Sequence, residues 1–402
     1  MSNVSFVEKL LDGAGVAWLP LERVTQYEQP TKYLVAAKNY NDEFDTPVLT
    51  AGKTFVLGYT DEVTGIYKAS KNPVIIFDDF TTASKWVDFD FKVKSSAMKM
   101  ITSSDESKTS LKYIYYWLNT LPSELVEGDH KRQWIGNFCK KRIPIPCPEN
   151  PERSLQIQKE IVRILDTFTE LTAELTAELT ARKKQYNYYR DQLLSFEERK
   201  DIHWMALGNI GKFIRGKRFT KVDYVHDGIN AIHYGEIYTH YDTSAHKAIS
   251  HVKLEMAQKL RFALPNDVII TDVGETVEDV GKPVAWLGSD AVAIHDHCYA
   301  FRHTMNPKFV SYCMQTSRFI AEKNKYVART KVNTLLVNGF AKIQIPVPSH
   351  KEQARIVTIL DKFNVLTNSI SEGLPREIEL RQKQYEYYRD LLFSFPKSQE
   401  VA

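Results

Sequence analysis

Three stretches of the sequence concentrate cations beside glycine, serine or asparagine. They are GNIGKFIRGKRFTKV (208–222), KVKSSAMKM (92–100) and ARTKVN (328–333). Arginine, lysine and asparagine side chains can bind phosphates and pair with the edges of guanine and adenine. The candidate contacts are Lys92, Lys94, Lys99, Lys212, Arg215, Lys217, Arg218, Lys221, Arg329, Lys331 and Asn333. Any one stretch could be an ordinary solvated face, but three stretches spread along the chain favour a nucleic-acid duplex as the ligand.

Motifs for catalysis are weak. TAGKT (50–54) ends like a phosphate loop, but Pro47 occupies the position of its first glycine. FDDF (77–80) is the only dense acidic pair, and adjacent aspartates on a strand point to opposite faces. HDHC (295–298) could place two histidines on one strand face as metal ligands, yet no further ligand cluster is visible. We therefore predict no catalytic residue and no metal, with strand or DNA-facing histidines favoured.

Composition sets wider limits. The chain has 402 residues, 43% hydrophobic and 26% charged, which suits two or three globular domains. Its net charge of +3 and pI of about 8.4 permit nucleic-acid binding without arguing for it. There is no apolar run of transmembrane length and no signal-peptide pattern at the start, and the four cysteines lack metal spacing. We expect a cytoplasmic protein with reduced cysteines.

A sequence repeat indicates which elements hold these residues in place. RKKQYNYYRDQLLSF (182–196) returns as RQKQYEYYRDLLFSF (381–395), with eleven of fifteen positions identical. Upstream of it, IPIPCP (143–148) returns as IQIPVP (343–348), and QKEIVRILDTF (158–168) as QARIVTILDKF (353–363).

Within each copy, apolar residues recur at steps of three and four, which predicts a long helix with a coiled-coil-like seam. The first should run from about Glu160 to Phe196, roughly 55 Å at about 1.5 Å per residue. In the second, Gly373 and Pro375 predict a kink or break. Two such helices are most simply an antiparallel, pseudo-twofold pair between two domains. The alternative is two unrelated helical linkers, each packed on its own domain.

The domains differ in sequence but begin alike, with VAWLPL (16–21) and IHWMAL (202–207). Both contain short apolar runs bounded by turn residues, such as NPVIIFDD (72–79) and NDVIITDVG (266–274), which indicates a mixed α/β fold with short-stranded sheets. We predict a first recognition domain at 1–150, a first spacer helix at 151–200, a second recognition domain at 201–348 and a second spacer helix at 349–402.

This combination resembles the specificity subunit of type I restriction–modification systems. The resemblance rests on the paired QYxYYRDxLxSF helix ends, the IPIP-like ends, and ILDTF with ILDKF. Further segments look like target-recognition segments of that family: TAGKTFVLGYT (50–60), VIIFDDFTT (74–82), YGEIYTHY (234–241) and GETVEDVGKPVAWLG (274–288). They add Lys53, Thr54 and Tyr234 to the candidate DNA contacts.

The resemblance implies that each domain reads one half of a split, asymmetric DNA sequence in the major groove. It also implies that the helices dock two methyltransferase subunits, which bring S-adenosylmethionine, and that translocase-nuclease subunits using ATP and Mg join them. The chain itself would then hold no cofactor and catalyse nothing. The candidate partner contacts are Tyr186, Tyr189, Arg190, Tyr385, Tyr388 and Arg389. The alternatives are an enzyme with an unrecognised site around FDDF, and a helix-pair scaffold without sequence-specific DNA binding.

One prediction concerns LTAELTAEL (171–179), where a four-residue unit is written twice. Inserting one more TAEL should lengthen the helix by about 6 Å. That is less than two base-pair rises of about 3.4 Å. The preferred spacing between the two half-sites should therefore increase, as measured by binding to duplexes of graded spacer length. An unchanged preferred spacing would show that this segment does not set the distance.

Overall fold

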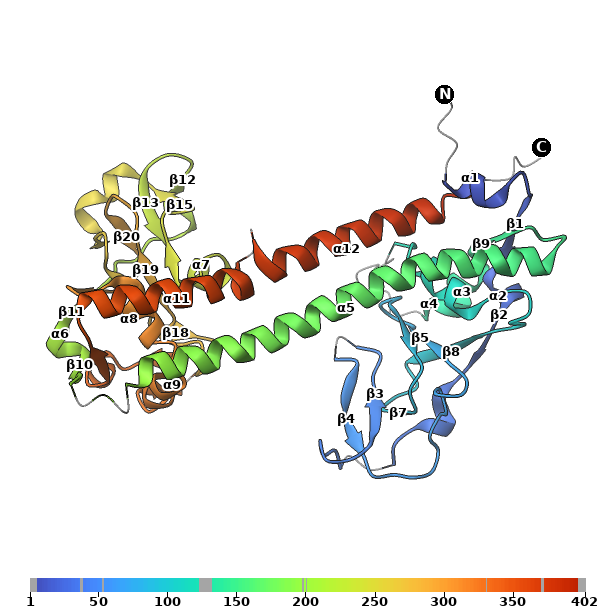
Figure 1. Cartoon of the computed structure of the whole chain (residues 1–402), viewed down its shortest axis with the longest axis horizontal. Helices are drawn as coiled ribbons and strands as arrows, with labels where there is room; N and C mark the ends of the chain where they lie inside the picture. The colour runs from blue at the N-terminus through green and yellow to red at the C-terminus, as the bar shows by residue number, and fades with distance from the viewer. Residues whose placement is uncertain are drawn as a thin grey trace. The chain divides into compact units, whose positions relative to one another are not determined.

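The computed structural model describes residues 6–36, 39–52, 54–122, 132–196, 199, 201–329, 331–369 and 372–396 (Figure 1). The chain divides into two compact units, one of which is discontinuous in sequence. Unit 1 is Met1–Ala173 with Leu380–Ala402, and unit 2 is Glu174–Glu379. Each unit therefore combines one globular domain with parts of two long helices, α5 (Pro151–Ser195) and α12 (Gly373–Leu392).

Unit 1 is built on short strands in small sheets. In spatial order the sheets are β2 (Thr25–Glu28), β8 (Met98–Ser103), β5 (Val74–Asp78) and β6 (Ser84–Val87); β4 (Val56–Thr60), β3 (Thr46–Leu49) and β7 (Lys92–Val93); and β1 (Val16–Pro20) with β9 (Arg142–Pro146). The helices are α1 (Phe6–Leu11), α2 (Leu21–Val24), α3 (Leu111–Leu118) and α4 (Gln133–Gly136), with 3-10 turns at Pro30–Tyr33 and Phe138–Lys140. All of β5 is buried, as its apolar sequence predicts.

Unit 2 has larger sheets, and one of them contains the fully buried strand β17 (Val268–Thr271). Its five-stranded sheets are β11 (Gly211–Arg215), β21 (Cys298–His303), β17, β19 (Pro283–Trp286) and β14 (Ser244–Ala245); and β12 (Tyr224–Val225), β15 (Ser250–Val252), β13 (Ile229–Ile232), β20 (Val292–Ile294) and β16 (Phe262–Ala263). The smaller sheets are β18 (Val273–Gly274), β23 (Asn333–Leu335) and β22 (Val327–Ala328); and β10 (His203–Ala206) with β24 (Gln344–Val347).

Unit 2 also contains the long helix α11 (His350–Asn368), and its remaining helices are short. They are α6 (Leu207–Ile210), α7 (Tyr234–Thr239), α8 (Pro307–Cys313), α9 (Ser317–Asn324) and α10 (Val337–Phe340), with 3-10 turns at Lys221–Asp223 and Leu254–Lys259. The predicted mixed α/β class with short-stranded sheets and a long helix pair is confirmed. No helix in the described part of the chain is long and apolar enough to cross a membrane.

The repeated proline-rich pieces close the two domains. In unit 1, β9 pairs antiparallel with β1, so IPIP lies against VAWLP. In unit 2, β24 pairs in the same way with β10, so QIPV lies against HWMA. Proline suits these two-stranded ribbons because each strand keeps one unpaired edge. The two sequence ends of each domain therefore meet where its helix departs.

Helix α5 begins at Pro151, earlier than the predicted start near Glu160. The side chain of Asn150 accepts a hydrogen bond from the amide of Arg153 at 3.1 Å, and proline occupies the first helical position. Both are start signals that the apolar seam does not contain. The helix ends at Ser195, and Phe196 adopts a left-handed φ of 48°.

The second long helix is broken, as predicted. Helix α11 (His350–Asn368) ends before Ser369, which is extended, and α12 starts again at Gly373. Gly373 has a φ of 74°, a conformation that favours glycine, and Pro375 falls in the first turn of α12.

Within each unit the two helices meet through one stacked aromatic pair. In unit 1, Phe168 of α5 stacks on Tyr388 of α12 with ring centroids 5.3 Å apart. In unit 2, Phe363 of α11 stacks on Tyr189 of α5 at 5.7 Å. The head of each repeat copy, ILDTF or ILDKF, is thus joined to the tail of the other copy. Because the pairs run in opposite order along the chain, the helices pack antiparallel.

The same heads are tied to their domains by equivalent polar contacts. Tyr116 donates a hydrogen bond to Asp166 at 2.5 Å, and Tyr312 donates one to Asp361 at 2.7 Å. Burial, and then the carboxylate, raises the pKa of both phenols, which keeps them protonated as donors. A lysine one turn before each tyrosine contacts the same carboxylate, namely Lys112 at 2.9 Å and Lys308 at 2.6 Å.

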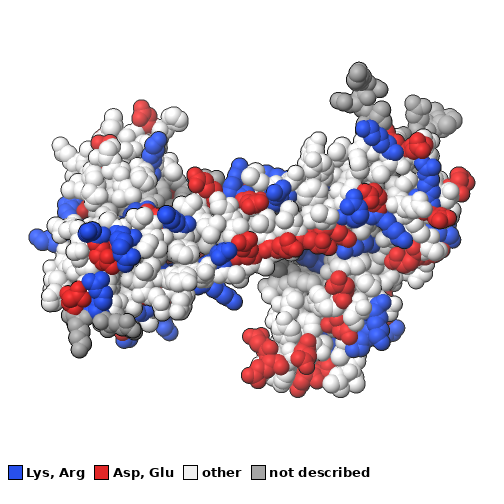
Figure 2. All heavy atoms as spheres, viewed as in Figure 1, with Lys and Arg blue, Asp and Glu red and all other residues white. Residues whose placement is uncertain are grey.

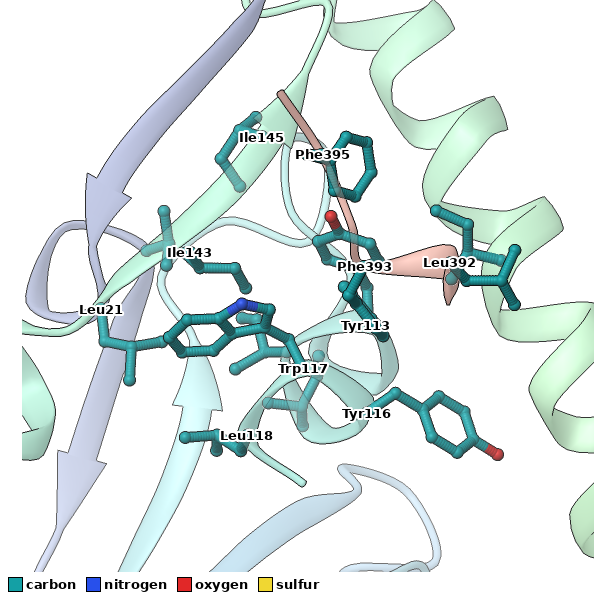
Figure 3. Packing of buried hydrophobic residues seen from close by; sticks show 14 of the residues in the cluster. Leu21, Tyr113, Tyr116, Trp117, Leu118, Ile143, Ile145, Leu392, Phe393 and Phe395 are labelled. Atoms are coloured by element: carbon teal, nitrogen blue, oxygen red, sulfur yellow. The ribbon is translucent and has the colours of Figure 1, made fainter. Parts of the chain in front are cut away.

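The tails end in the cores. Leu392, Phe393 and Phe395 are buried in unit 1, where Phe393 packs against Tyr113 at 5.1 Å (Figure 3). The core side chains around them include Leu21, Ile143 and Ile145. In unit 2 the matching tail buries Leu194 and Phe196 beside Leu207, Ile343 and Ile345. Each domain core is therefore completed by a tail that follows the other domain in sequence.

We predict that Phe393→Ala lowers the free energy of unfolding of the full chain by about 3–5 kcal/mol, since a buried aromatic side chain is removed. Urea unfolding followed by tryptophan fluorescence measures the change. Phe89→Ala is the matched control, because Phe89 is an exposed phenylalanine of the same unit. Equal, small effects of both substitutions would show that the tail does not contribute to the core.

Candidate nucleic-acid interface

The basic stretch 208–222 lies over α6, β11 and the following loop, and its five cationic side chains are all exposed. Its backbone, however, is already engaged. The amide of Gly216 donates to the carbonyl of Cys298 at 2.9 Å, and that of Lys217 to Ile294 at 3.0 Å. A Cβ at Gly216 would lie 2.1 Å from the carbonyl oxygen of His295, so this glycine permits a close approach of two backbones. Side chains, rather than these amides, are available to phosphates.

Part of this stretch lines a cavity of about 400 Å³ in unit 2. The lining includes the predicted residues Arg218, Lys221 and Tyr234, together with His233, His295 and His297. Burial lowers the pKa of His233, and lowers that of His295 to about 4. Those two imidazoles are therefore neutral at neutral pH, and the charged side chains of the lining include the exposed cations Arg218 and Lys221 and the carboxylate of Asp296. Such a cavity can accept a polar or anionic group.

Arg215 lies at the end of β11. Its Nε donates to the carbonyl of Asp296 at 3.0 Å, and its Nη2 contacts the carboxylate of Asp272 at 3.1 Å. Lys212 sits at the other end of the same strand, in register with Arg302 of β21.

The third basic stretch forms the β22–β23 hairpin, which extends the strand that follows Asp272. Val273 of β18 is in register with Thr334 of β23. Arg329 and Lys331 are exposed between the two hairpin strands, while the side-chain amide of Asn333 donates to the carbonyl of Glu275 at 2.8 Å. The fold thus brings the stretches 208–222 and 328–333 to neighbouring elements of one unit.

In unit 1 the candidates are scattered. Lys53 lies outside the described residues. Thr54 lies in the loop between β3 and β4, and the half-buried Lys94 follows β7 with its amide bonded to Leu49 of β3 at 2.9 Å. These positions place Lys94 beside the end of the β3–β4 hairpin that carries the loop.

Lys92 and Lys99 instead have buried side chains with partners inside the domain. Lys92 contacts Glu62 at 2.9 Å and donates to the carbonyl of Thr64 at 2.7 Å. Lys99 faces Asp79 at 3.5 Å. Both lysines support the domain in this conformation, and neither presents its ammonium group to an external ligand.

Acidic side chains restrict where a duplex could lie. Asp45 and Asp61 are exposed where β3 begins and β4 ends, opposite the loop. On α5, Glu170, Glu174 and Glu178 are exposed four residues apart, and acidic side chains form a row over this helix (Figure 2). Because these groups repel phosphates, this face of α5 does not suit DNA, and the loop end of the hairpin suits it better than the base.

The FDDF pair has structural contacts. Asp78 accepts hydrogen bonds from the amide of Phe80 at 2.9 Å and the hydroxyl of Thr81 at 2.7 Å, which closes a turn. Asp79 accepts from the amide of Trp134 at 2.9 Å. Among the described residues, no group of three or more histidine, cysteine or acidic side chains is arranged to hold a metal ion.

The predicted partner residues on the helix ends are largely used in packing. Tyr186 is buried beneath the guanidinium of Arg190, 5.5 Å from its ring, and Tyr385 lies likewise beneath Arg389 at 5.8 Å. Tyr189 and Tyr388 form the stacked pairs with phenylalanine described above, and keep one exposed edge.

Sequence reasoning missed the middle tyrosine of each copy. Tyr188 is 58% exposed and Tyr387 is 65% exposed, and each ring lies edge-on against the stacked tyrosine that follows it. The signal was available, because an aromatic residue off the apolar seam of a helix does not face the partner helix. Each copy of the repeat therefore exposes one tyrosine ring at the equivalent position of its helix.

The chain has two domains of short strands that are joined by long helices, and both domains have cationic side chains at the surface. These features are typical of a modular nucleic-acid-binding protein. The sequence model of the family described as "Type I restriction modification DNA specificity domain" matches residues 24–182 and 200–380.

Individual relatives agree over the full length. The chain is 56% identical to the EcoR124I/EcoR124II specificity subunit of Escherichia coli over 100% of both proteins. It is 30% identical to a putative type I specificity subunit of Haemophilus influenzae, over 98% of this chain and 99% of that protein. The crystal structure of the S subunit of a type I system from M. genitalium shares the fold, with a TM-score of 0.55, 15% identity and coverage of 96% and 98%. The chain belongs to the family of type I restriction–modification specificity subunits.

Proposed function

We propose that this chain reads a bipartite, asymmetric duplex sequence, one half with each domain, and positions methyltransferase and translocase-nuclease subunits on it. Unit 2 would use the surface around Arg215, Arg218, Lys221 and the β22–β23 hairpin. Unit 1 would use the loop end of the β3–β4 hairpin with Lys94. The chain would act in the cytoplasm without a catalytic centre of its own, while its partners bring S-adenosylmethionine, ATP and Mg.

The observation that carries this proposal is the repetition of one set of contacts around two unlike domains. Both units have a two-stranded ribbon, β1–β9 in unit 1 and β10–β24 in unit 2. Both have a tyrosine bonded to a helix aspartate, Asp166 or Asp361, and a helix tail buried in the core. The exposed domain surfaces differ. A repeated frame with different surfaces suits two distinct sequence readers that share one kind of partner.

The first test is selection from random duplex DNA by the tagged full chain, captured with its partners from its own host. We expect two short, unlike blocks at one fixed spacing. A single continuous block would show that only one domain reads DNA and would refute the bipartite proposal. No enrichment, with a methyltransferase-sized partner still captured, would favour the scaffold alternative.

A second prediction assigns the two partner sites to Tyr188 and Tyr387. Each single alanine substitution should remove one of two bound methyltransferase copies, and the double variant should remove both, because an exposed aromatic anchor is lost from one site at a time. Native mass spectrometry of the captured complex measures the stoichiometry. Leu380→Ala, which truncates another exposed side chain on α12, is the control. Retention of both copies by the double variant would exclude this surface.

A further inference from the structure

A buried carboxylate in unit 2 lies between two side chains that reach the surface. Asp272 is 2% exposed and follows the buried strand β17. Its amide donates to the carbonyl of His297 at 3.0 Å, and its carbonyl accepts from the amide of Leu335 at 2.7 Å. Its backbone is therefore fixed by two separate segments of the unit.

Each oxygen of this carboxylate holds a different partner. Oδ1 lies 3.0 Å from Nδ1 of His297, and Oδ2 lies 3.1 Å from Nη2 of Arg215. Burial raises the pKa of Asp272, while the imidazole and the guanidinium oppose that change. Removing a buried carboxylate from water is unfavourable unless charged or hydrogen-bonding partners compensate for it. Arg215 and His297 provide that compensation.

The two partners remain accessible from outside. The Arg215 side chain is 51% exposed and that of His297 is 39% exposed. Arg215 is further restrained by its bond to the carbonyl of Asp296, and by the ring of Tyr299 at 5.8 Å. The His297 ring packs edge-on against Tyr234 at 5.3 Å and lines the cavity with Arg218. Both groups are held in fixed orientations at the surface that carries the candidate DNA contacts.

The carboxylate also fixes which atoms point outward. Because the Nδ1 of His297 faces an acceptor, a neutral imidazole here is the tautomer with the proton on Nδ1, and in this tautomer Nε2 is an acceptor. Arg215 retains N–H donors beyond those bonded to Asp272 and Asp296. A donor and an acceptor tethered to one carboxylate complement a base edge that offers one of each. In the major groove adenine presents N7 as acceptor and the N6 amino group as donor, whereas guanine presents two acceptors.

We propose that Asp272 is a positioning residue that holds Arg215 and His297 as a base-reading pair for an A·T pair in the half-site of unit 2. This inference rests on the proposed function, because it requires that unit 2 reads duplex DNA. It differs from a purely structural role for Asp272 in predicting an effect confined to one base pair.

The matched control lies at the other end of the same strand. Asp267, directly before β17, is also buried and also holds a half-exposed arginine, Arg302, at 2.9 Å. It accepts a further hydrogen bond from the amide of Leu264 at 2.8 Å. Asp267→Asn and Asp272→Asn therefore remove the same charge from comparable buried ion pairs, but only Asp272 is joined to His297.

The experiment measures binding of the captured complex to the selected duplex and to a set of its single-base-pair variants. Asp272→Asn, Arg215→Ala and His297→Ala should each reduce discrimination at one and the same A·T pair by about tenfold or more, the contribution expected of a good side-chain pair to a base. Discrimination in the other half-site and binding to unrelated DNA should stay within about twofold. Asp267→Asn should leave all discrimination unchanged.

Several outcomes would overturn the inference. If Asp272→Asn weakens binding to all duplexes equally, its role is structural. If the three variants affect different base pairs, or a G·C pair, the shared reading is wrong, although the proposed function stands. If the unsubstituted complex selects no DNA, the proposed function fails and this inference fails with it. Thermal unfolding of each variant separates loss of reading from loss of folding.

Discussion

The organisation of this protein depends on the exchange of helix tails between its two domains. Each repeat copy starts on the domain that precedes it and ends in the core of the other one, as Phe393 with Tyr113 and Phe196 with Ile343 show. The stretch occurs twice in the sequence because each of the two domain cores is completed by one copy of it. The apolar surroundings of each tail include the domain ends, where β1 meets β9 and β10 meets β24, and in unit 1 they also include Tyr113 of α3.

Polar contacts give the exchange its specificity. Gln158 and Gln353 are both buried at the helix starts, and each side chain bonds two backbone groups of its own domain. Asp166 and Asp361 then hold a tyrosine and a lysine each. Hydrogen bonds to buried groups contribute modest net stability but are costly to leave unmade, so they restrict the helices to one rotational setting. That setting determines which aromatic residues of each tail face solvent.

Much of this arrangement was predictable from the sequence. Repetition and apolar spacing gave the helix pair, and Gly373 with Pro375 gave its break. Contacts between residues distant in sequence could not be predicted. Lys92 and Lys99 resemble free cations in a sequence, and only the fold brings Glu62 and Asp79 to them. The seam also identified the face that packs, which is why Tyr186 and Tyr385 were selected ahead of Tyr188 and Tyr387. Leu165 and Leu194 are buried beside the seam because the helix ends contact their domains as well as each other.

The discontinuity of unit 1 also bears on the order in which the protein can mature. Domains generally fold as units while the chain emerges from the ribosome, with the earliest domain first. Here residues 380–395 are synthesised after the whole of unit 2, which is contiguous in sequence. Unit 1 therefore lacks part of its core until these residues have been synthesised, whereas unit 2 can complete its fold before unit 1 does. The last step of folding is therefore the packing of residues 380–395 into the incomplete core of unit 1.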